Sequence, residues 1–485
     1  MTDREKRYDK LFIGGEWVVP SSGARIMVSS ASTEEPLGEV ASAEVADVDW
    51  AVAAAREAFD DPKGWAHWEP GQRAEVLERF ADELTARADA IASTVSSQNG
   101  MPIRISRQTE AKVPATLLRY YANLARSTDA EERRKSLVAG STLVRGEPIG
   151  VVGAVVPWNF PQTLTFFKLA PALAAGCTVV LKPSSETVLD AMLIAEAAAA
   201  ADLPPGVLNI VPGSGRGAGA HLVAHPGVDK VAFTGSTGAG RTIAEACARL
   251  LRPVTLELGG KSAGIILDDV DLGVAMKGMF ASTLLNQGQS CYISTRILAP
   301  RNRYREIVEA FTALASSLSI GDALDPGTAI GPLATARQRE VVESYIAKGI
   351  AEGGTVTTGG KRPAEFDKGW FVEPTIFADL DNDATIAREE IFGPVLVVIP
   401  YENTDDAVRI ANDSEFGLGG TVWTSDLDRG LGVARRVHTG SIGINGFTMD
   451  HGSPFGGVKS SGIGRELGPE GLRAYQHSKS IYLPG

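Results

Sequence analysis

The sequence is poor in cysteine and histidine and has no long apolar run. Its 485 residues include three cysteines and six histidines. So sparse and odd a cysteine count argues against a disulfide framework and favours a reducing, cytoplasmic environment. No segment approaches the roughly 18 consecutive apolar residues of a membrane span. The first ten residues are strongly charged and contain no apolar stretch, so we expect no secretory signal.

The chain also lacks any excess of positive charge, because its formal net charge is −12. An acidic protein of this kind is a poor partner for nucleic acid or an anionic membrane, so we expect neither. With 44% hydrophobic and 22% charged residues, the composition is globular. The length is sufficient for two or three domains with sizeable cores.

Two of the few histidines, His221 and His225, stand four residues apart, which would place them on one face of a helix. Leu222 occupies the place where a zinc protease motif has its glutamate, and no further ligand is evident. We therefore expect surface or helix-capping histidines and no metal site.

Residues 150–260 alternate between short β-rich runs and helical stretches of about a dozen residues. This alternation is typical of βαβ units and a parallel sheet. The predicted strands are 151–155, 178–181, 207–211, 230–233 and 254–256, and the predicted helices include 188–201 and 240–250.

Residues 260–440 repeat this alternation, which predicts a second α/β domain. Its predicted strands are 263–267, 296–299, 395–400 and 420–423, with helices at 303–318 and 336–352. Residues 45–125 are mainly helical, with predicted helices at 48–59 and 71–83 and a long stretch around 105–126. Residues 136–144 and 478–483 alternate like strands, and such strands would be exposed edges unless they are joined.

Three short segments supply the groups needed for chemistry at a carbonyl carbon. Cys291 offers a thiol nucleophile, Glu257 a carboxylate base, and Asn159 a side-chain amide for an oxyanion. The other two cysteines, Cys177 and Cys247, lie in strand-like and helical patterns, where a small buried hydrophobic role is expected.

Two glycine- or serine-containing segments follow predicted strands. Residues 233–241 open a helix, and their glycines and helix N-terminus favour a phosphate. The spacing is not the usual dinucleotide fingerprint, so a plain strand-to-helix turn is an open alternative. Residues 182–187 end another predicted strand, at the edge where parallel sheets bind ligands.

With these motifs in this order, the whole chain resembles the aldehyde dehydrogenase superfamily. The resemblance implies an α/β fold with a variant Rossmann cofactor domain at residues 1–127 and 148–258 and an α/β catalytic domain at 259–460. It also implies a small β oligomerisation domain at 128–147 and 461–485, where the terminal strand meets a neighbouring subunit. A homodimer or homotetramer is therefore expected.

The resemblance also assigns roles to the reactive groups. Cys291 would add to the aldehyde, while Asn159 and the backbone N–H of Cys291 stabilise the oxyanion. Glu257 would activate water to hydrolyse the thioester, which favours a free acid over an acyl-coenzyme A product. Lys168 and Glu466 match positions that relay protons from this glutamate.

The remaining matched positions form a cofactor set and a substrate set. Those expected to bind the cofactor are Trp158, Lys182, Ser184, Ser185, Gly235, Ser236, Leu258, Glu390 and Phe392. Those expected to line the aldehyde tunnel are Phe160, Leu164, Phe167, Ser290, Tyr292 and Phe455.

The expected tunnel lining is apolar and aromatic, and no arginine lies beside Cys291. We therefore expect neutral aliphatic or aromatic aldehydes, with a semialdehyde dehydrogenase of the same superfamily as the alternative. Asp450 and His451 could tune the tunnel entrance. A second alternative is a non-catalytic protein on the same fold, but such a protein would be expected to lose Cys291, Glu257 or Asn159. A third is a thiol esterase that uses Cys291 without a cofactor, and the cofactor motifs make that a side activity at most.

One position departs from the family pattern. Members that prefer NAD usually carry a glutamate three residues after Lys182, whereas this chain has Ser185 there and Glu186 next to it. A carboxylate repels the extra phosphate of NADP and a serine can donate to it. We therefore expect NADP to be accepted, either alone or alongside NAD. The alternative is that Glu186 swings inward and restores NAD preference.

Overall fold

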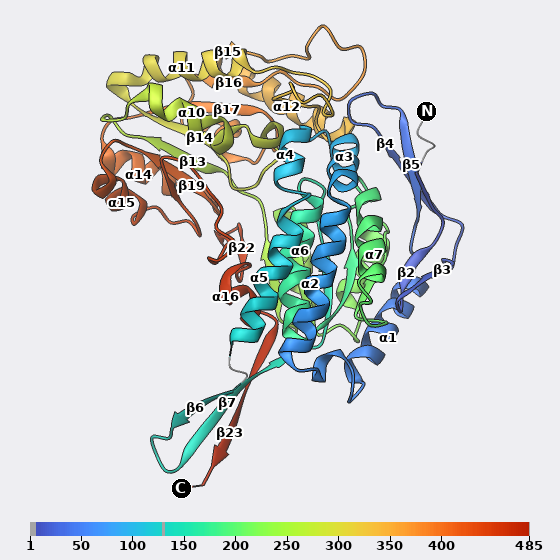
Figure 1. Ribbon diagram of the computed structural model, residues 1–485. Coiled ribbons are helices and arrows are strands. Elements are labelled where there is room, and N and C mark those ends of the chain that lie inside the picture. Colours follow the sequence, from blue (N-terminus) through green and yellow to red (C-terminus); the bar gives the residue numbers. More distant parts are fainter. Residues whose placement is uncertain (1–5, 129–130, 485) are drawn as a thin grey trace.

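The computed structural model describes residues 6–128 and 131–484. Two α/β units lie one above the other, and a narrow β-arm extends from the lower unit (Figure 1). The lower unit contains an eight-stranded sheet and the upper unit a seven-stranded sheet. Residues 1–5 of the predicted cofactor domain, and residues 129–130 and 485 of the predicted oligomerisation domain, lie outside the described residues.

The lower sheet has a parallel centre of five strands. Its order is β12 (Val254–Glu257), β11 (Lys230–Thr234), β8 (Val151–Val155), β9 (Thr178–Lys182) and β10 (Leu208–Ile210). The chain builds outward from β8 to β9 and β10 on one side, and then to β11 and β12 on the other. Strand order therefore reverses between β8 and β11, which is where parallel sheets bind ligands. The edges are the antiparallel strands β22 (Gly462–Ile463), β2 (Leu11–Ile13) and β3 (Glu16–Val18).

Helices cover both faces of this sheet. One face packs against α2 (Pro70–Ala86), α3 (Ala88–Asn99), α5 (Val113–Ser127), α6 (Pro161–Ala175) and α7 (Leu189–Ala200), and the other against α1 (Val45–Asp60), α8 (Ala220–Ala224) and α9 (Thr237–Arg249). All 15 residues of α6 are buried, because the helix lies between the sheet and its outer helices. Its first N–H groups must therefore be satisfied by protein rather than by water.

The upper sheet has six parallel strands in the order β16 (Thr375–Ala378), β17 (Val395–Tyr401), β14 (Ser294–Pro300), β13 (Ser262–Ile266), β19 (Gly420–Trp423) and β20 (Gly443–Ile444), with antiparallel β15 (Thr355–Thr358) at one edge. One face packs against α10 (Leu272–Thr283) and α11 (Tyr304–Ser317). The other packs against α12 (Ala336–Ala351), α13 (Thr385–Arg388), α14 (Thr404–Asn412) and α15 (Leu427–Ala434).

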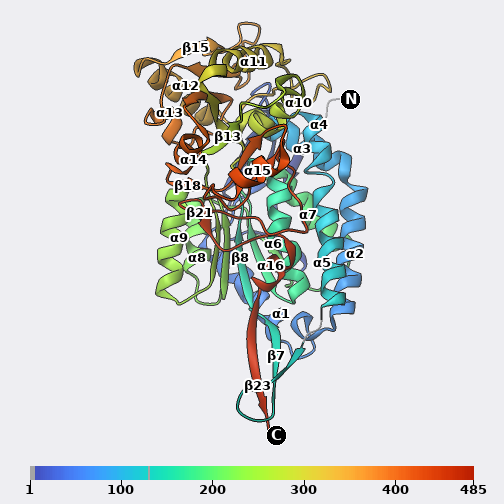
Figure 2. The ribbon, with the colours of Figure 1, turned by 90° about the vertical axis from the view of Figure 1, so that its left-hand side faces the viewer.

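The arm is a three-stranded antiparallel sheet of β6 (Glu131–Lys135), β7 (Ser141–Pro148) and β23 (Gln476–Leu483), visible at the bottom of Figures 1 and 2. The predicted strand at 136–144 is wrong in its bounds, because residues 136–140 form the turn of a hairpin. Gly140 has a φ of 73°, a left-handed conformation that glycine adopts without strain. β23 pairs with β7 of its own chain, and its contact with a neighbouring subunit stays a prediction.

The predicted strands of both units are confirmed, with small shifts at their ends. The long helical stretch around 105–126 is wrong as one helix, because α4 (Ile103–Gln108) ends before α5 begins at Val113. Pro114 in the first turn of α5 cannot continue a helix from the preceding residues. The structure also contains small elements that no sequence pattern predicted: β1 (Lys6–Tyr8), β4 (Arg25–Ser29), β5 (Pro36–Ala41), β18 (Phe416–Gly417), β21 (Val458–Lys459) and α16 (Gly468–Arg473).

Among residues 6–128 and 131–484, no helix is both long enough and apolar enough to span a bilayer.

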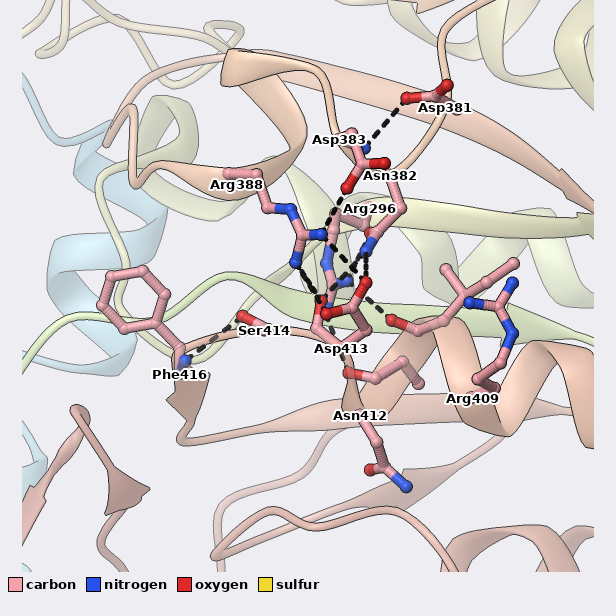
Figure 3. A network of polar contacts seen from close by, with 12 residues as sticks. Arg296, Asp381, Asn382, Asp383, Arg388, Arg409, Asn412, Asp413, Ser414 and Phe416 are labelled. Atoms are coloured by element: carbon pink, nitrogen blue, oxygen red, sulfur yellow. Dashed lines mark hydrogen bonds and ion pairs between the residues drawn. The ribbon is translucent and has the colours of Figure 1, made fainter.

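A buried arginine joins the upper sheet to its surrounding loops (Figure 3). Arg296 in β14 is 2% exposed and donates to the carbonyls of Lys261, Ile410 and Ala411 and to Oδ1 of Asn382, at 2.7–3.0 Å. Burial, together with the charge of Arg388, lowers its pKa to about 10. The contact with Lys261 matters for the site, because this residue follows the segment that contains Glu257.

We expect Arg296→Met to destabilise the protein by about 3–5 kcal/mol, since it leaves several buried carbonyls without a donor. Arg388→Ala, at a partly exposed arginine with ion pairs to Asp383 and Asp413, should cost about 1 kcal/mol or less. Thermal and urea unfolding of both variants would measure the difference. Equal unfolding midpoints for Arg296→Met and wild type would contradict this role of Arg296.

Candidate active site

A cleft of about 260 Å³ lies at the strand-order reversal between β8 and β11. Segments after β8, β11 and β12 form one wall, and loops of the upper unit form the other. The lining residues are Pro157, Trp158, Asn159, Thr234, Gly235, Ser236, Leu258, Gly259, Cys291, Gln338, Val341, Glu390, Ile391 and Phe392. The cleft thus brings together eight of the predicted site residues from five separate segments.

Cys291 follows a loop with an unusual backbone. Asn286 and Gln287 have φ values of 51° and 54°, a left-handed conformation that costs non-glycine residues about 1–3 kcal/mol each. The side chain of Gln287 donates to the carbonyls of Gly100 and Pro332 at 2.9 and 3.0 Å. These buried bonds offset the strain and fix the loop that presents the thiol.

The environment of Cys291 favours the neutral thiol. Burial raises its pKa, and the nearby charges of Glu390 and Glu257 raise it further. Cys177 and Cys247 are also free and are both buried, as predicted. Cys291 is the only cysteine with a partly exposed side chain, and it is the only one that lines the cleft.

Asn159 is held on both its backbone and its side chain. Its carbonyl accepts from the amides of Asn99 and Asn286 at 3.1 and 3.0 Å. Its own side-chain nitrogen donates to the carbonyl of Gln289 at 3.0 Å. An amide nitrogen has two N–H groups, so one remains for another acceptor in the cleft.

Glu257 ends β12 and is 3% exposed, and neither carboxylate oxygen has a hydrogen-bond partner within the described chain. Burial raises its pKa well above 4.5, and the charge of Glu466 adds to this, while Lys168 and Arg465 act in the opposite direction. The backbone of Gly456 packs against it so closely that a Cβ there would lie 2.5 Å from Oε1.

Lys168 and Glu466 form an ion pair of 2.8 Å and are 0% and 2% exposed. Lys168 also donates to Oγ1 of Thr234 at 2.6 Å. Glu466 Oε2 has no hydrogen-bond partner in the described part of the chain. The charges of both side chains shift the pKa of Glu257, so Glu257, Lys168 and Glu466 form one electrostatically coupled buried group.

The cleft fits a dinucleotide. Ser236 caps the N-terminus of α9, where backbone N–H groups favour a phosphate, and glycines bring the backbone close to the cleft. Glu390 accepts from the N–H of Gly260 at 2.9 Å, and a Cβ at Gly259 would lie 2.2 Å from its Oε2. The rings of Trp158 and Phe392 meet edge to face at 5.3 Å.

The predicted ribose loop follows the neighbouring strand β9. The Lys182 ammonium donates to the carbonyl of Pro183 at 2.8 Å, and burial lowers its pKa to about 8. Ser185 Oγ donates to the carbonyl of Gly213 at 3.2 Å. Glu186 is exposed and accepts from the hydroxyl of Ser184, so in this structure it does not take the place of Ser185.

Aromatic rings gather on the other side of Cys291. Tyr292 stacks on Phe447 at 4.6 Å, and both Tyr292 and Phe167 meet Phe455 edge to face at 6.4 and 6.5 Å. Phe160 and Leu164 belong to the same apolar cluster. Beside it lies a cavity of about 150 Å³ whose lining includes Asp450 and no lysine or arginine.

A sequence model of the aldehyde dehydrogenase family matches residues 17–481. The geranial dehydrogenase of Castellaniella defragrans is 57% identical over 478 residues, which cover 99% of both proteins. The 3-succinoylsemialdehyde-pyridine dehydrogenase of a Pseudomonas species is 41% identical over 477 residues and 98% of both proteins.

The chain belongs to the aldehyde dehydrogenase family.

Solved structures of this family superimpose closely. A Mycobacterium tuberculosis aldehyde dehydrogenase with NAD+ matches with a TM-score of 0.97 and 48% identity, over 99% of both chains. A mutant Pseudomonas syringae aldehyde dehydrogenase with NAD+ and octanal matches with a TM-score of 0.94 and 40% identity, over 98% of this chain and 96% of that one. The α/β fold and the aldehyde dehydrogenase assignment are therefore confirmed, with NAD(P)+ as the cofactor of the reaction.

Several residues that shape the site of this aldehyde dehydrogenase were not predicted from the sequence. Gln338 in α12 donates to the carbonyls of Ile391 and Phe392 at 3.1 and 2.9 Å and clamps Phe392, whose φ is 58°. Asn99 likewise donates to the carbonyl of Asn159, and Phe447 stacks on the ring of Tyr292. They are single residues far from any recognisable motif, so no sequence signal marked them.

The histidine pair does gain a third group, Asp49, whose Oδ1 lies 2.5 Å from His221 Nε2 and 3.3 Å from His225 Nε2. The N–H of Gly227 donates to Nδ1 of His225 at 3.0 Å. The neutral ring therefore carries its proton on Nε2, the nitrogen that faces Asp49. This is a hydrogen-bonded surface cluster, and a metal at Nε2 would require the Gly227 contact to break.

We expect the charges around Glu257 to set the acid limb of the kcat profile, because a general base acts only when deprotonated. Lys168→Met removes a positive charge, which raises the pKa of Glu257 and moves the limb to higher pH. Glu466→Gln removes a negative charge, which lowers that pKa and moves the limb to lower pH. Steady-state rates between pH 5 and 10 would measure both, and shifts of the same sign would contradict the electrostatic origin.

Proposed function

We propose that this chain oxidises neutral, apolar aldehydes to free carboxylic acids through a thioester on Cys291. The observation that carries the proposal is the cleft itself. It joins a partly exposed thiol and an amide donor to glycine-rich segments suited to a dinucleotide. Glu257 lies close enough to Cys291 for its charge to raise the pKa of the thiol.

In the first step, the sulfur of Cys291 bonds to the aldehyde carbon and the carbonyl oxygen becomes an oxyanion. The free N–H of Asn159 stabilises this oxygen, and such a donor typically contributes about 3–4 kcal/mol. The raised pKa means that the thiol must lose a proton, and Glu257 is the carboxylate available to accept it. The bound dinucleotide supplies the acceptor for the hydride that leaves the carbon.

In the second step, Glu257, once it has passed the first proton on, takes a proton from water as the water oxygen bonds to the thioester carbon. The carbon–sulfur bond then breaks, which releases the acid and leaves Cys291 as the thiolate. Its unbonded oxygens and raised pKa suit a general base that works near neutral pH. Lys168 and Glu466 form the buried charge group that would pass this proton on. The presence of Glu257 favours water over coenzyme A as the acyl acceptor.

The lining supports the choice of substrate. The aromatic cluster around Phe455 offers apolar contact, and Asp450 would repel a second carboxylate. The relatives include a geranial dehydrogenase at 57% identity and a structure with bound octanal. A semialdehyde is the competing class, because one relative at 41% identity is named for such a substrate.

The assembly and location are also part of this proposal. The β-arm has fully exposed apolar residues at its tip, Leu137 and Val138, which supports packing against further copies as a dimer or tetramer. The three free cysteines support a reducing, cytoplasmic location. The two sheets and the arm support the division into cofactor, catalytic and oligomerisation domains.

The substrate class can be tested with octanal, geranial and succinic semialdehyde under identical conditions. We expect kcat/KM to favour the two apolar aldehydes by about 100-fold or more, because unpaired charge is costly in an apolar tunnel. The acid should appear without coenzyme A, and Cys291→Ala should remove all oxidation. Preference for the semialdehyde would overturn the assignment.

The cofactor choice can be tested at residue 185. We expect wild type to use NADP as well as NAD, because Ser185 brings no charge to the ribose phosphate and Lys182 lies beside it. Ser185→Glu should lower kcat/KM for NADP at least about tenfold and change NAD little, through repulsion of like charges. Ser185→Gln, of similar size and uncharged, is the matched control. If Ser185→Glu and Ser185→Gln are equal for both cofactors, this position does not set the choice.

A further inference from the structure

One buried carboxylate near the site has no part in the chemistry described above. Glu110 lies in the short break between α4 and α5 and is 0% exposed. Burial raises its pKa to about 7, and the charge of Asp190 adds to this, while the bonds it accepts lower it. A buried acid without a cation is costly to the fold, so its contacts should explain its presence.

Those contacts all lie at the start of α6. Oε2 accepts from the backbone N–H of Gln162 at 2.8 Å and, more weakly, from that of Thr163 at 3.4 Å. Oε1 accepts from the hydroxyl of Thr163 at 2.6 Å. Phe160, the residue that precedes the helix, provides no side-chain cap of its own, and Pro161 has no N–H. Glu110 therefore caps α6 from a segment some 50 residues away in sequence.

This cap stands immediately beside the reactive groups. Asn159 lies two residues before α6, and the helix contains Leu164, Phe167 and Lys168. The position of the Asn159 amide relative to Cys291 depends on where the first turn of α6 sits. Because α6 is buried along its whole length, water cannot replace the missing acceptor if the cap is removed.

We propose that Glu110 is a positioning residue for the aldehyde oxidation, which holds the first turn of α6 so that Asn159 meets the oxyanion. The proposal rests on the proposed function of Asn159 and Cys291. A displacement of about 1 Å at such a donor can cost about 100-fold in rate, whereas cofactor affinity depends on other segments. Glu110 acts through Asn159 and does not touch the reacting atoms.

The test separates the oxyanion from the rest of the site. In Glu110→Ala we expect kcat and the acylation burst to fall about 100-fold, with KM for the dinucleotide changed less than about threefold. Alkylation of Cys291 by iodoacetamide should stay within about threefold of wild type, because that reaction forms no oxyanion. Glu110→Gln keeps an acceptor oxygen of the same reach and should recover at least about tenfold of the lost rate.

The matched control is Asp426→Ala. Asp426 caps α15 by accepting from the N–H groups of Asp428 and Arg429, far from the cleft, so its loss should leave kcat unchanged.

If Glu110→Ala does not fold, a second variant tests the same contact. Thr163→Val removes one of the hydrogen bonds to Glu110 and should lower the acylation rate at least about threefold. An unchanged rate in the folded Glu110 variant, or in Thr163→Val where Glu110→Ala does not fold, would overturn the proposal. So would equal losses of acylation and alkylation. Failure of the wild type to oxidise octanal with either NAD or NADP would instead refute the proposed function.

Discussion

The buried ion pair between Lys168 and Glu466 joins helix α6 to the C-terminal segment of the chain. Lys168 comes from α6, and Glu466 from the segment that follows β22, which pairs with β12 in the lower sheet. Breaking such a pair by removing one partner typically costs about 3–5 kcal/mol, because the other charge stays buried. The same pair acts on Glu257. The docking of the C-terminal segment on α6 and the pKa of Glu257 therefore both depend on this ion pair.

The cleft follows from the topology of the lower sheet. Parallel strands place the segments after β8, β11 and β12 at the same edge, so Asn159, Gly235 and Glu257 converge although they are far apart in sequence. The upper unit then needs only to present Cys291 and Glu390 to that edge. Its buried Arg296 contacts the carbonyl of Lys261, close to where the chain passes from one unit to the other. The stability of this passage between the two units and the geometry of the cleft are thus linked.

Sequence reasoning succeeded where a local pattern repeats and failed where a contact is long-range. The alternating apolar runs predicted the parallel strands, and the thiol, carboxylate and amide motifs predicted residues that line one cleft or act on it. The break at 109–112 was missed although Pro114 is a local signal for it. What the sequence could not show is the long-range contact made in the break, where Glu110 caps α6. The hairpin turn at 136–140 was missed because alternating residues fit a continuous strand equally well. Asn99 and Gln338 gave no local signal.

Glu257 and Glu110 show how partner groups decide what a buried carboxylate does. Burial raises the pKa of both. Glu110 accepts three hydrogen bonds, which stabilise its charged form and make it a fixed cap. Glu257 is positioned by close contact with Gly456 and accepts none within the described chain, so its lone pairs stay available and basic. A hydrogen bond to Glu257 would fix it better but would weaken it as a base, which explains why the site relies on shape at this residue.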